Sequence, residues 1–247
     1  MPIKACNTRV LVGGVDLSGE TNTIGVNIQG RNLEYGVLQD CDTRRLAMPP
    51  KSEIEHNGYY SGVADTGIEQ MLYTYLADTT GVHVAAIYDT GGAAPFAYVQ
   101  DKGYNATYGL PAQVGQLLQV KGKWPTLTGS GNQMVRGYQV FGGVISSTGG
   151  KTGIDFGAAG AAGGRAYLFV TSITGTASSA SVKLQSDTDI AHGTTADEGT
   201  FTFSAVGCYE VALTGTVNRY QRANVVSLGG ATAFTACLIS CISGRTY

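Results

Sequence analysis

The sequence predicts a mainly β protein, a β-sandwich or barrel with one α-helix. Three observations predict this class. Many short stretches alternate apolar and polar residues with the two-residue period of a half-buried strand. Glycine is abundant, at 36 of 247 residues, whereas proline occurs only 6 times. Clusters of Gly, Asn, Asp and Ser, which favour turns, separate the alternating stretches, and this spacing is typical of sandwiches and barrels rather than of βαβ units.

The predicted strands follow one another along the chain. In order they are RVLVGGV, TIGVNIQG, VHVAAIY, FAYVQ, QLLQVKGKW, RAYLFVTSI, SVKLQS, GTFTFSA, YEVALTGTV and ATAFTACLIS. A further stretch with strand character, TGTVNRYQRANVV at 214–226, contains Arg219 and Arg222. Successive side chains of a strand point to opposite faces, so the two arginines are expected on opposite faces and not in one basic patch. Each arginine is predicted to make its own polar contact, either within the chain or with an adjoining subunit.

One helix is predicted, at about 66–78, within the stretch DTGIEQMLYTYLADTTG. Thr66 can cap its first turn, and Glu69 three residues later completes a capping box. Gly81 stands where a helix stop is expected. The apolar residues that share one helical face are Ile68, Leu72, Tyr75 and Leu76. This stripe is predicted to face the core.

Two halves are predicted, residues 1–143 with the helix and residues 150–247 as an all-β half. The boundary is placed in 142–164, where GGVISSTGGKTGIDFGAAGAAGG is rich in Gly, Ala, Ser and Thr and poor in large apolar residues. This segment is expected to be a linker or a long hairpin whose tip packs on a neighbour. The two halves are also compatible with one continuous domain.

The chain is sparing with charge. Charged residues make up 14% of it, against roughly 25% in an ordinary soluble domain. This composition favours a subunit whose surface is largely covered by copies of itself. The net charge of −2 argues against nucleic-acid binding through a basic face. No run approaches the roughly 18–20 apolar residues of a membrane helix, and no signal-peptide core is recognised at the start, so folding in a cytoplasm is expected.

The five cysteines do not form a disulfide framework in this prediction. They are scattered and odd in number: Cys6, Cys41, Cys208, Cys237 and Cys241. The last two lie four residues apart in one predicted strand, about 13 Å, which is beyond the roughly 7 Å limit between the Cα atoms of a disulfide. Buried free thiols are therefore expected.

Two acidic stretches are candidates for chemistry. KSEIEH at 51–56 places Glu53 and Glu55 on one face of a strand and His56 on the other, so the three side chains cannot converge on one metal ion or substrate atom, and a solvated strand face is predicted. The loop SDTDIAHGTTADE at 186–198 offers oxygen ligands for a cation without the spacing of an EF-hand. Its acidic and histidine residues are Asp187, Asp189, His192, Asp197 and Glu198. A polar hairpin loop is predicted there, with a weak cation site as the alternative.

No motif of an enzyme is present. There is no G-x-S-x-G, GSG at 129–131 lacks the rest of a phosphate loop, and GGKTG at 149–153 lacks the first glycine of a P-loop. The three histidines, His56, His83 and His192, are far apart without the spacing of metal ligands. The sequence therefore predicts a non-enzymatic protein with no catalytic, cofactor-binding or metal-binding residues and no cofactor.

The order of segments resembles the major tail proteins, or tail tube proteins, of long-tailed bacteriophages. NTRVLVGGVDLSGETNTIGVNI is similar to the opening strand, turn and second strand of that family, and DCDTRRLAMPPKSEIEHNGYYSG to the Pro-containing loop and strand before its helix. GTFTFSAVGCYEVALTGTVNRYQRANVVSLGGATAFTACLIS is similar to its closing strands. The resemblance covers nearly the whole chain and depends on order and spacing. The chain departs from some relatives in having a single tryptophan, Trp124.

The resemblance implies a structural role in the virion. Tail tube subunits form rings, commonly hexamers, that stack into the conduit for DNA ejection, with strands of each subunit joining one inner β-barrel. It implies that the partners are further copies and other tail proteins, and that double-stranded DNA passes without specific binding. Six copies would carry about −12 in total, the sum of six charges of −2, so carboxylates are expected to outnumber Lys and Arg on the channel wall. Assembly in the host bacterial cytoplasm is expected.

Two other classes remain as alternatives. A β-sandwich binding module, for carbohydrate or for decorating a capsid, would need an exposed aromatic platform, for which Tyr59 with Tyr60, or Tyr104 with Tyr108, are the candidates. A glycan hydrolase would need two carboxylates facing each other across a cleft, which nothing in the sequence specifies. Ring symmetry stays open between a hexamer and a trimer of duplicated folds.

Overall fold

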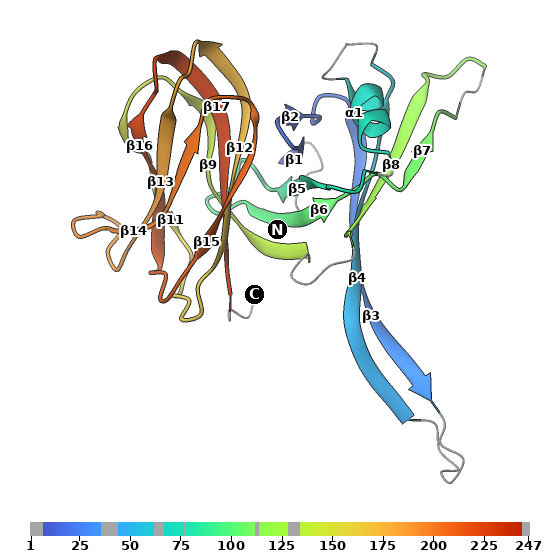
Figure 1. Ribbon diagram of the computed structural model, residues 1–247, viewed down its shortest axis with the longest axis horizontal. Coiled ribbons are helices and arrows are strands. Elements are labelled where there is room, and N and C mark those ends of the chain that lie inside the picture. The colour runs from blue at the N-terminus through green and yellow to red at the C-terminus, as the bar shows by residue number, and fades with distance from the viewer. Residues whose placement is uncertain are drawn as a thin grey trace. The chain divides into compact units, whose positions relative to one another are not determined.

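The protein is mainly β, as the computed structural model shows (Figure 1). The structure describes residues 7–35, 44–61, 67–76, 78–111, 114–127 and 134–243, with side chains for all of these except 31–35 and 44–49. The elements are β1 (Thr8–Val12), β2 (Val15–Asp16), β3 (Thr21–Tyr35), β4 (Arg44–Tyr59), α1 (Ile68–Thr74), β5 (Val82–Tyr88), β6 (Phe96–Gly103), β7 (Thr107–Gly109), β8 (Gln119–Pro125), β9 (Met134–Ile145), β10 (Gly149–Gly150), β11 (Ile154–Asp155), β12 (Gly164–Gly175), β13 (Ala180–Asp187), β14 (Ala196–Phe203), β15 (Gly207–Leu213), β16 (Tyr220–Ser227) and β17 (Ala231–Ile242).

Each predicted strand stretch overlaps an observed strand, but the helix is shorter than predicted. It spans Ile68–Thr74 rather than about 66–78. Its end is explained by Asn105, whose side-chain amide donates to the Leu72 carbonyl (2.8 Å) and whose backbone N–H donates to the Tyr75 carbonyl (2.9 Å). At its start, the Ile68 N–H donates to a carboxylate oxygen of Glu20 (2.7 Å). The predicted cap, Thr66, lies outside the described residues.

The chain divides into two compact units that differ from the two predicted halves. Unit 1 comprises residues 1–19, 85–99 and 135–247, and unit 2 comprises residues 20–84 and 100–134. Segment 142–164, which the composition suggested as a boundary, lies wholly inside unit 1. Strands β5 and β6 contribute residues to both units.

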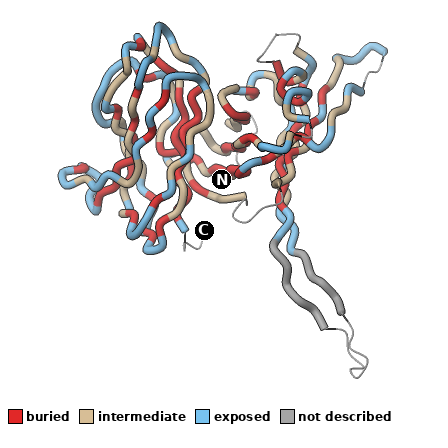
Figure 2. The backbone as a smooth tube through the Cα atoms, in the orientation of Figure 1, coloured by how far each residue is buried: buried red, intermediate tan, exposed pale blue. Residues whose placement is uncertain are grey.

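Unit 1 contains a sandwich of two sheets. One sheet has the order β15-β12-β17-β9-β6-β5-β1-β2, and the other has the order β10-β16-β13-β14, with β11 also on β16. Buried side chains from both sheets form the core between them, and buried residues run along their strands in Figure 2. The largest buried members of this core are Phe156, Phe201, Phe203 and Phe234. Alternation along β13 and β12 produces this layer because every second side chain faces the other sheet.

The eight-stranded sheet coils so that its two ends approach each other. Gly14, between β1 and β2, lies against the backbone at the start of β15, where a Cβ atom would come 2.5 Å from the Gly207 nitrogen. Inside this coil, side chains of β1, β5 and β6 pack with Tyr167 and Phe169 of β12 and with Ile239 of β17. Of the predicted sandwich or barrel, unit 1 shows the sandwich, and one of its two sheets is coiled.

The glycine-rich segment after β9 lies along the second sheet of the sandwich. β10 and β11 both pair with β16, and the backbone N–H of Lys151 donates to the Ala223 carbonyl (2.8 Å). Gly150 lies against the guanidinium of Arg222, which a Cβ atom would approach to 3.0 Å. The absence of large side chains thus lets two short strands lie close to β16.

The two arginines of TGTVNRYQRANVV are both bound within the chain. Arg219 precedes β16 rather than lying in it, so the expected strand alternation begins only at Tyr220. Its guanidinium binds both carboxylate oxygens of Asp155, at 2.7 and 2.6 Å. Arg222, inside β16, donates to the Gln185 side-chain oxygen (3.1 Å). Both arginines therefore make their side-chain hydrogen bonds within the chain.

Unit 2 is built on a four-stranded antiparallel sheet with the order β3-β4-β8-β7. Its first two strands form a long hairpin, paired from Thr21↔Gly58 to Tyr35↔Arg44, whereas β4 pairs with β8 only between Glu53 and Tyr59. The hairpin therefore continues past the end of β8 as a two-stranded ribbon (Figure 1).

The three described cysteines are free thiols, as expected. Cys237 and Cys241 are buried, and Cys208 is half-buried. Burial raises the pKa of the Cys237 thiol to about 12, so this group remains protonated and unreactive. Cys6 and Cys41 lie outside the described residues. In the described part of the chain, no helix has the length and apolar character needed to cross a bilayer.

Candidate functional site

The sheet of unit 2 has two chemically different faces. Residues paired across its strands share a face, and one such row consists of Tyr108, Gly122, His56 and Ile24. We call the face of this row the helix-covered face, because α1 packs on it. The opposite face, which we call the polar face, carries Lys51, Glu53, Glu55 and Asn57 of β4, Lys121 and Lys123 of β8, and Thr23, Gly25, Asn27 and Gln29 of β3.

Two glycines allow α1 to approach the helix-covered face. A Cβ atom at Gly122 would come 2.2 Å from a methyl group of Leu72, and one at Gly58 would come 2.5 Å from Ile68 and 2.4 Å from the Glu20 carbonyl oxygen. Ile68 and Leu72 are fully buried. The predicted apolar stripe of the helix therefore faces the core at these two positions, over β4 and β8.

The acidic residues of KSEIEH are arranged as the alternation predicted, but one of them is buried. Glu53 is only 5% exposed, and Lys123 binds both Glu53 (3.0 Å) and Glu55 (2.6 Å). Burial opposes ionisation of Glu53, but Lys123 and Lys51 together hold the pKa of its carboxyl below its usual value. The prediction of a fully solvated face was thus wrong for Glu53, because β8 supplies a lysine beside it.

His56 lies on the helix-covered face, as predicted, and is completely buried. Its Nδ1 accepts a hydrogen bond from the indole Nε1–H of Trp124 (2.9 Å), and the two rings stack with centroids 6.0 Å apart. Burial lowers the pKa of His56 to about 4, so the ring is neutral at pH 7. His56 is therefore a structural core residue rather than a ligand.

Each edge of this sheet contains an uncharged segment. The regular part of β3 runs from Thr23 to Gln29 between two register shifts, and the described β7 strand is Thr107–Gly109. No named strand pairs with the outer side of either one in the described part of the chain. Natural edge strands are commonly protected by lysine, proline or an inward charge, because an unpaired edge is a template for another chain. These two edges lack charged protection and are suited to pairing.

Exposed aromatic residues gather beside β7. Tyr73 of α1 is 62% exposed and meets Tyr108 edge to face, with ring centroids 5.9 Å apart. The Tyr108 hydroxyl donates to Glu69 (2.6 Å), and this bond raises the pKa of Tyr108 to about 12. Tyr60, which follows β4, is 46% exposed. The sequence pattern did not identify Tyr73 as part of an exposed aromatic surface, because its helical position only placed it outside the predicted core stripe.

The acidic loop 186–198 holds itself together through its own side chains. Asp187 accepts backbone N–H groups of Asp189 and Thr194, and the second of these is the main reason that its pKa is lowered. Asp197 binds Lys183 (2.6 Å) and Gln185, and Glu198 accepts from Ser186. Among the described residues, the predicted candidates of this loop form no group of three that could hold a metal ion. The polar hairpin loop that the sequence predicted fits this arrangement.

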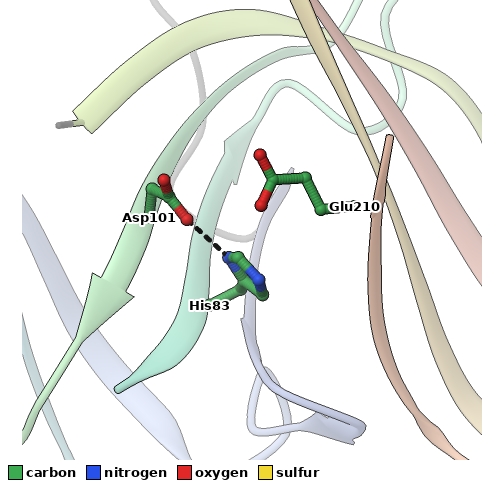
Figure 3. A group of neighbouring side chains, drawn as sticks. All are labelled: His83, Asp101 and Glu210. Atoms are coloured by element: carbon green, nitrogen blue, oxygen red, sulfur yellow. Dashed lines mark ion pairs between the residues drawn. The ribbon is translucent and has the colours of Figure 1, made fainter. Parts of the chain in front are cut away.

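The remaining candidates are dispersed. His83 Nδ1 lies 3.1 Å from a carboxylate oxygen of Asp101, and Figure 3 marks this ion pair of unit 2. His192 is buried in the loop between β13 and β14, where burial first and Arg222 second lower its pKa. The first two glycines of GGKTG form β10, and the Lys151 ammonium donates to the Ser147 carbonyl (3.0 Å). The GSG stretch lies outside the described residues.

Comparison with known proteins gives structural similarities at low sequence identity. The sequence matches no protein-family model and no curated protein. A chain of the PVC sheath–tube complex, from an extracellular contractile injection system, matches 55% of this chain and 90% of its own length, with 10% identity and a TM-score of 0.40. The tube-terminating cap of the anti-feeding prophage matches 55% of this chain and 91% of its own, with 9% identity and a TM-score of 0.40. The Dit protein of SPP1, described as a hub adsorption apparatus protein of phages that infect Gram-positive bacteria, matches 94% and 98%, with 10% identity and a TM-score of 0.35.

Proposed function

We propose that this protein is a tail tube subunit of a bacteriophage, a non-enzymatic structural protein without cofactors whose copies form stacked rings. The observation that carries the proposal is the open four-stranded sheet of unit 2. One of its faces is covered by α1, the other is polar, and its two edges carry no charged residue over Thr23–Gln29 of β3 and Thr107–Gly109 of β7. A sheet of this kind can continue from copy to copy until it closes as a barrel, which removes its edges.

The proposal places one face of the sheet on the outside of the barrel and the other on the inside. In a closed barrel of such sheets, α1 lies outside and the polar face lines a channel through which double-stranded DNA passes without specific binding. The ribbon beyond Gln29↔Lys51 supports the same proposal, because a two-stranded ribbon is marginally stable alone and gains stability by packing on a neighbour. Stacked rings, other tail proteins as partners, the virion as location and assembly in the host cytoplasm belong to this proposal. A hexamer is the ring we propose.

Electron microscopy of the purified full-length protein tests the proposal. Negatively stained rings or tubes with a central channel are expected, and a cryo-EM reconstruction would give the ring symmetry. The mass of the smallest closed species in solution, from light scattering, distinguishes six copies from three. Monodisperse monomers at high concentration, with no rings in the parent particle, would overturn the proposal.

A binding or decoration module is the second candidate, favoured by the exposed ring of Tyr73 against the partly buried Tyr108. Aromatic rings beside a hydrogen-bonded carboxylate are suited to stacking on sugars. This candidate predicts that monomers bind an immobilised glycan and that Tyr73→Ala abolishes the binding. Rings without glycan binding would exclude it.

A further inference from the structure

Exposed apolar side chains are concentrated on unit 2. Of the exposed large apolar residues in the described part of the chain, those of unit 2 are Ile28, Tyr59, Tyr60, Tyr73, Leu76, Leu110, Val114 and Leu117. Exposed apolar side chains that gather on one face commonly mark an interaction site. On the helix-covered face, the strand register places Ile28, and the ring contact with Tyr108 places Tyr73.

The helix leaves the two flanks of its face uncovered. α1 packs over β4 and β8 through Gly58 and Gly122, so the flanks on β3 and β7 extend beyond it. On the β7 flank stand Tyr108 and, from the helix, Tyr73. On the β3 flank, Ile24 lies in the same row as Tyr108, and Ile28, four residues along the strand on the same face, is 51% exposed.

We propose that these two flanks are the two halves of one contact between neighbouring copies: Tyr73 and Tyr108 of one copy pack on Ile24 and Ile28 of the next. This inference rests on the proposed function and names the side chains that would join its subunits. When the β3 edge of one copy pairs with the β7 edge of another, the helix-covered faces lie on the same side of the extended sheet. The tyrosine flank then stands beside the isoleucine flank.

The occupant is identified as a second copy by the match between the two edges. Both flanks are apolar, and both edges carry uncharged residues on the polar face, where the charges are on the central strands β4 and β8. Lys123 on β8 is bound by Glu53 and Glu55 of β4, so these charges are paired within one copy. No like charges of the edge segments Thr23–Gln29 and Thr107–Gly109 would therefore meet at the seam. A contact that uses two different edges is heterologous, which is the geometry that generates a ring.

Two blocking variants of the full-length protein test this contact. Ile28→Glu blocks the β3 flank and Tyr73→Glu blocks the β7 flank, because each would bury an unpaired carboxylate at the seam. Each variant alone is expected to weaken self-association by about 100-fold or more in sedimentation analysis. Val226→Glu is the matched control, since Val226 is a strand residue of unit 1 with 48% exposure, and it should associate as the wild type does.

Mixing the two blocked variants gives the sharper test. Each retains the flank that the other has lost, so a 1:1 mixture is expected to form a heterodimer that neither forms alone. Circular dichroism melts should show that both variants remain folded. Wild-type oligomers that persist in both variants would overturn this contact while leaving the proposed function in place. A dimer lost only in Ile28→Glu would show β3 pairing with itself and would overturn it too. A wild-type protein that never associates would remove the proposed function and this contact together.

Discussion

At the scale of single residues, the pair His56 and Trp124 shows how burial decides a role that the sequence left open. The strand alternation correctly placed His56 on the face opposite Glu53 and Glu55. It could not show that Trp124, 68 positions later, would donate a hydrogen bond to the ring. Because a neutral imidazole accepts this bond at Nδ1, a second proton at that atom would break it.

This bond predicts a dependence of stability on pH. The pKa of His56 falls from 6.5 in the unfolded chain to about 4 in the folded protein. As the pH falls through this range, the unfolded state takes up the proton first, so stability is complete above 6.5 and is lost progressively down to 4. The loss is about 3 kcal/mol for this shift. Urea unfolding between pH 7 and 5 should show about 2 kcal/mol of this loss, because the interval ends above the folded-state pKa of about 4.

The control for this prediction is His56→Gln, whose side chain cannot be protonated. Its stability should vary much less over the same interval. The remaining slope is assigned to His192, whose pKa is also lowered and whose contribution has the same sign. An unchanged slope in His56→Gln would refute the assignment.

The neighbouring carboxylates give a second prediction at this scale. Glu53 is 5% exposed and Glu55 is half-exposed, yet both bind the Lys123 ammonium. Glu53→Gln should lower the free energy of unfolding by about 1–2 kcal/mol, because a buried group loses a charge-assisted bond. Glu55→Gln should cost less than about 0.5 kcal/mol, as exposed ion pairs do. Equal effects in chemical denaturation would contradict the difference in burial.

At the scale of elements, the strands were predictable and the ends of the helix were not. Strand patterns such as VHVAAIY depend on local alternation, and β5 spans the whole of this stretch. The helix pattern of the sequence continues to Leu76. The helix ends earlier because Asn105 donates hydrogen bonds to the Leu72 and Tyr75 carbonyl groups. Its first N–H is bound by Glu20, 48 residues earlier. Contacts this distant in sequence leave no periodic signal.

Packing of α1 on the sheet gives the prediction for this scale. Gly58→Ala should destabilise unit 2 by about 1–3 kcal/mol, because its Cβ would meet the Glu20 backbone at 2.4 Å and neither the strand nor the turn can move freely. The transition temperature should fall by about 3–10 °C in calorimetry.

Gly25→Ala is the matched control for that change. Gly25 lies in β3 of the same sheet, and a Cβ atom there would have no neighbour within 4 Å. This variant should be as stable as the wild type or slightly more so, since alanine restricts the unfolded chain. A similar loss in both variants would show that the space over Gly58 is not the cause.

At the scale of the whole molecule, the division into units could not be predicted from composition. The change in composition at 142–164 does not mark a boundary between the units. It reflects two short strands that pair with β16, where small residues contact Arg222 and the strand backbone. The chain instead passes from one unit to the other within β5 and again within β6. Both strands have uniform strand patterns, and neither has the composition of a linker. Discontinuous units of this kind arise from pairing between distant strands, which local patterns do not encode.

The charges of the polar face bear on the expected channel. Among its described side chains, three lysines, Lys51, Lys121 and Lys123, accompany two carboxylates, Glu53 and Glu55. If this face lines the channel, an excess of carboxylates must come from other segments. A reconstruction of the tube that showed a net-basic wall would overturn the expected carboxylate excess while leaving the ring architecture intact.

The uncharged edges give the last prediction, which concerns assembly as a whole. Salt weakens the attraction between charged surfaces, and the screening length falls to about 3 Å at 1 M. Subunits that associate through charge therefore separate as the salt concentration rises. In the contact proposed above, the edge segments Thr23–Gln29 and Thr107–Gly109 carry no charge, and each copy carries a net charge of −2 that mildly opposes association. Raising sodium chloride from 0.05 to 0.5 M, roughly a threefold shortening of the screening length, should therefore leave the association constant unchanged or strengthen it slightly. Sedimentation equilibrium at several salt concentrations measures this, and a loss of about tenfold or more across the range would show that ion pairs, rather than the flanks of the sheet, hold the copies together.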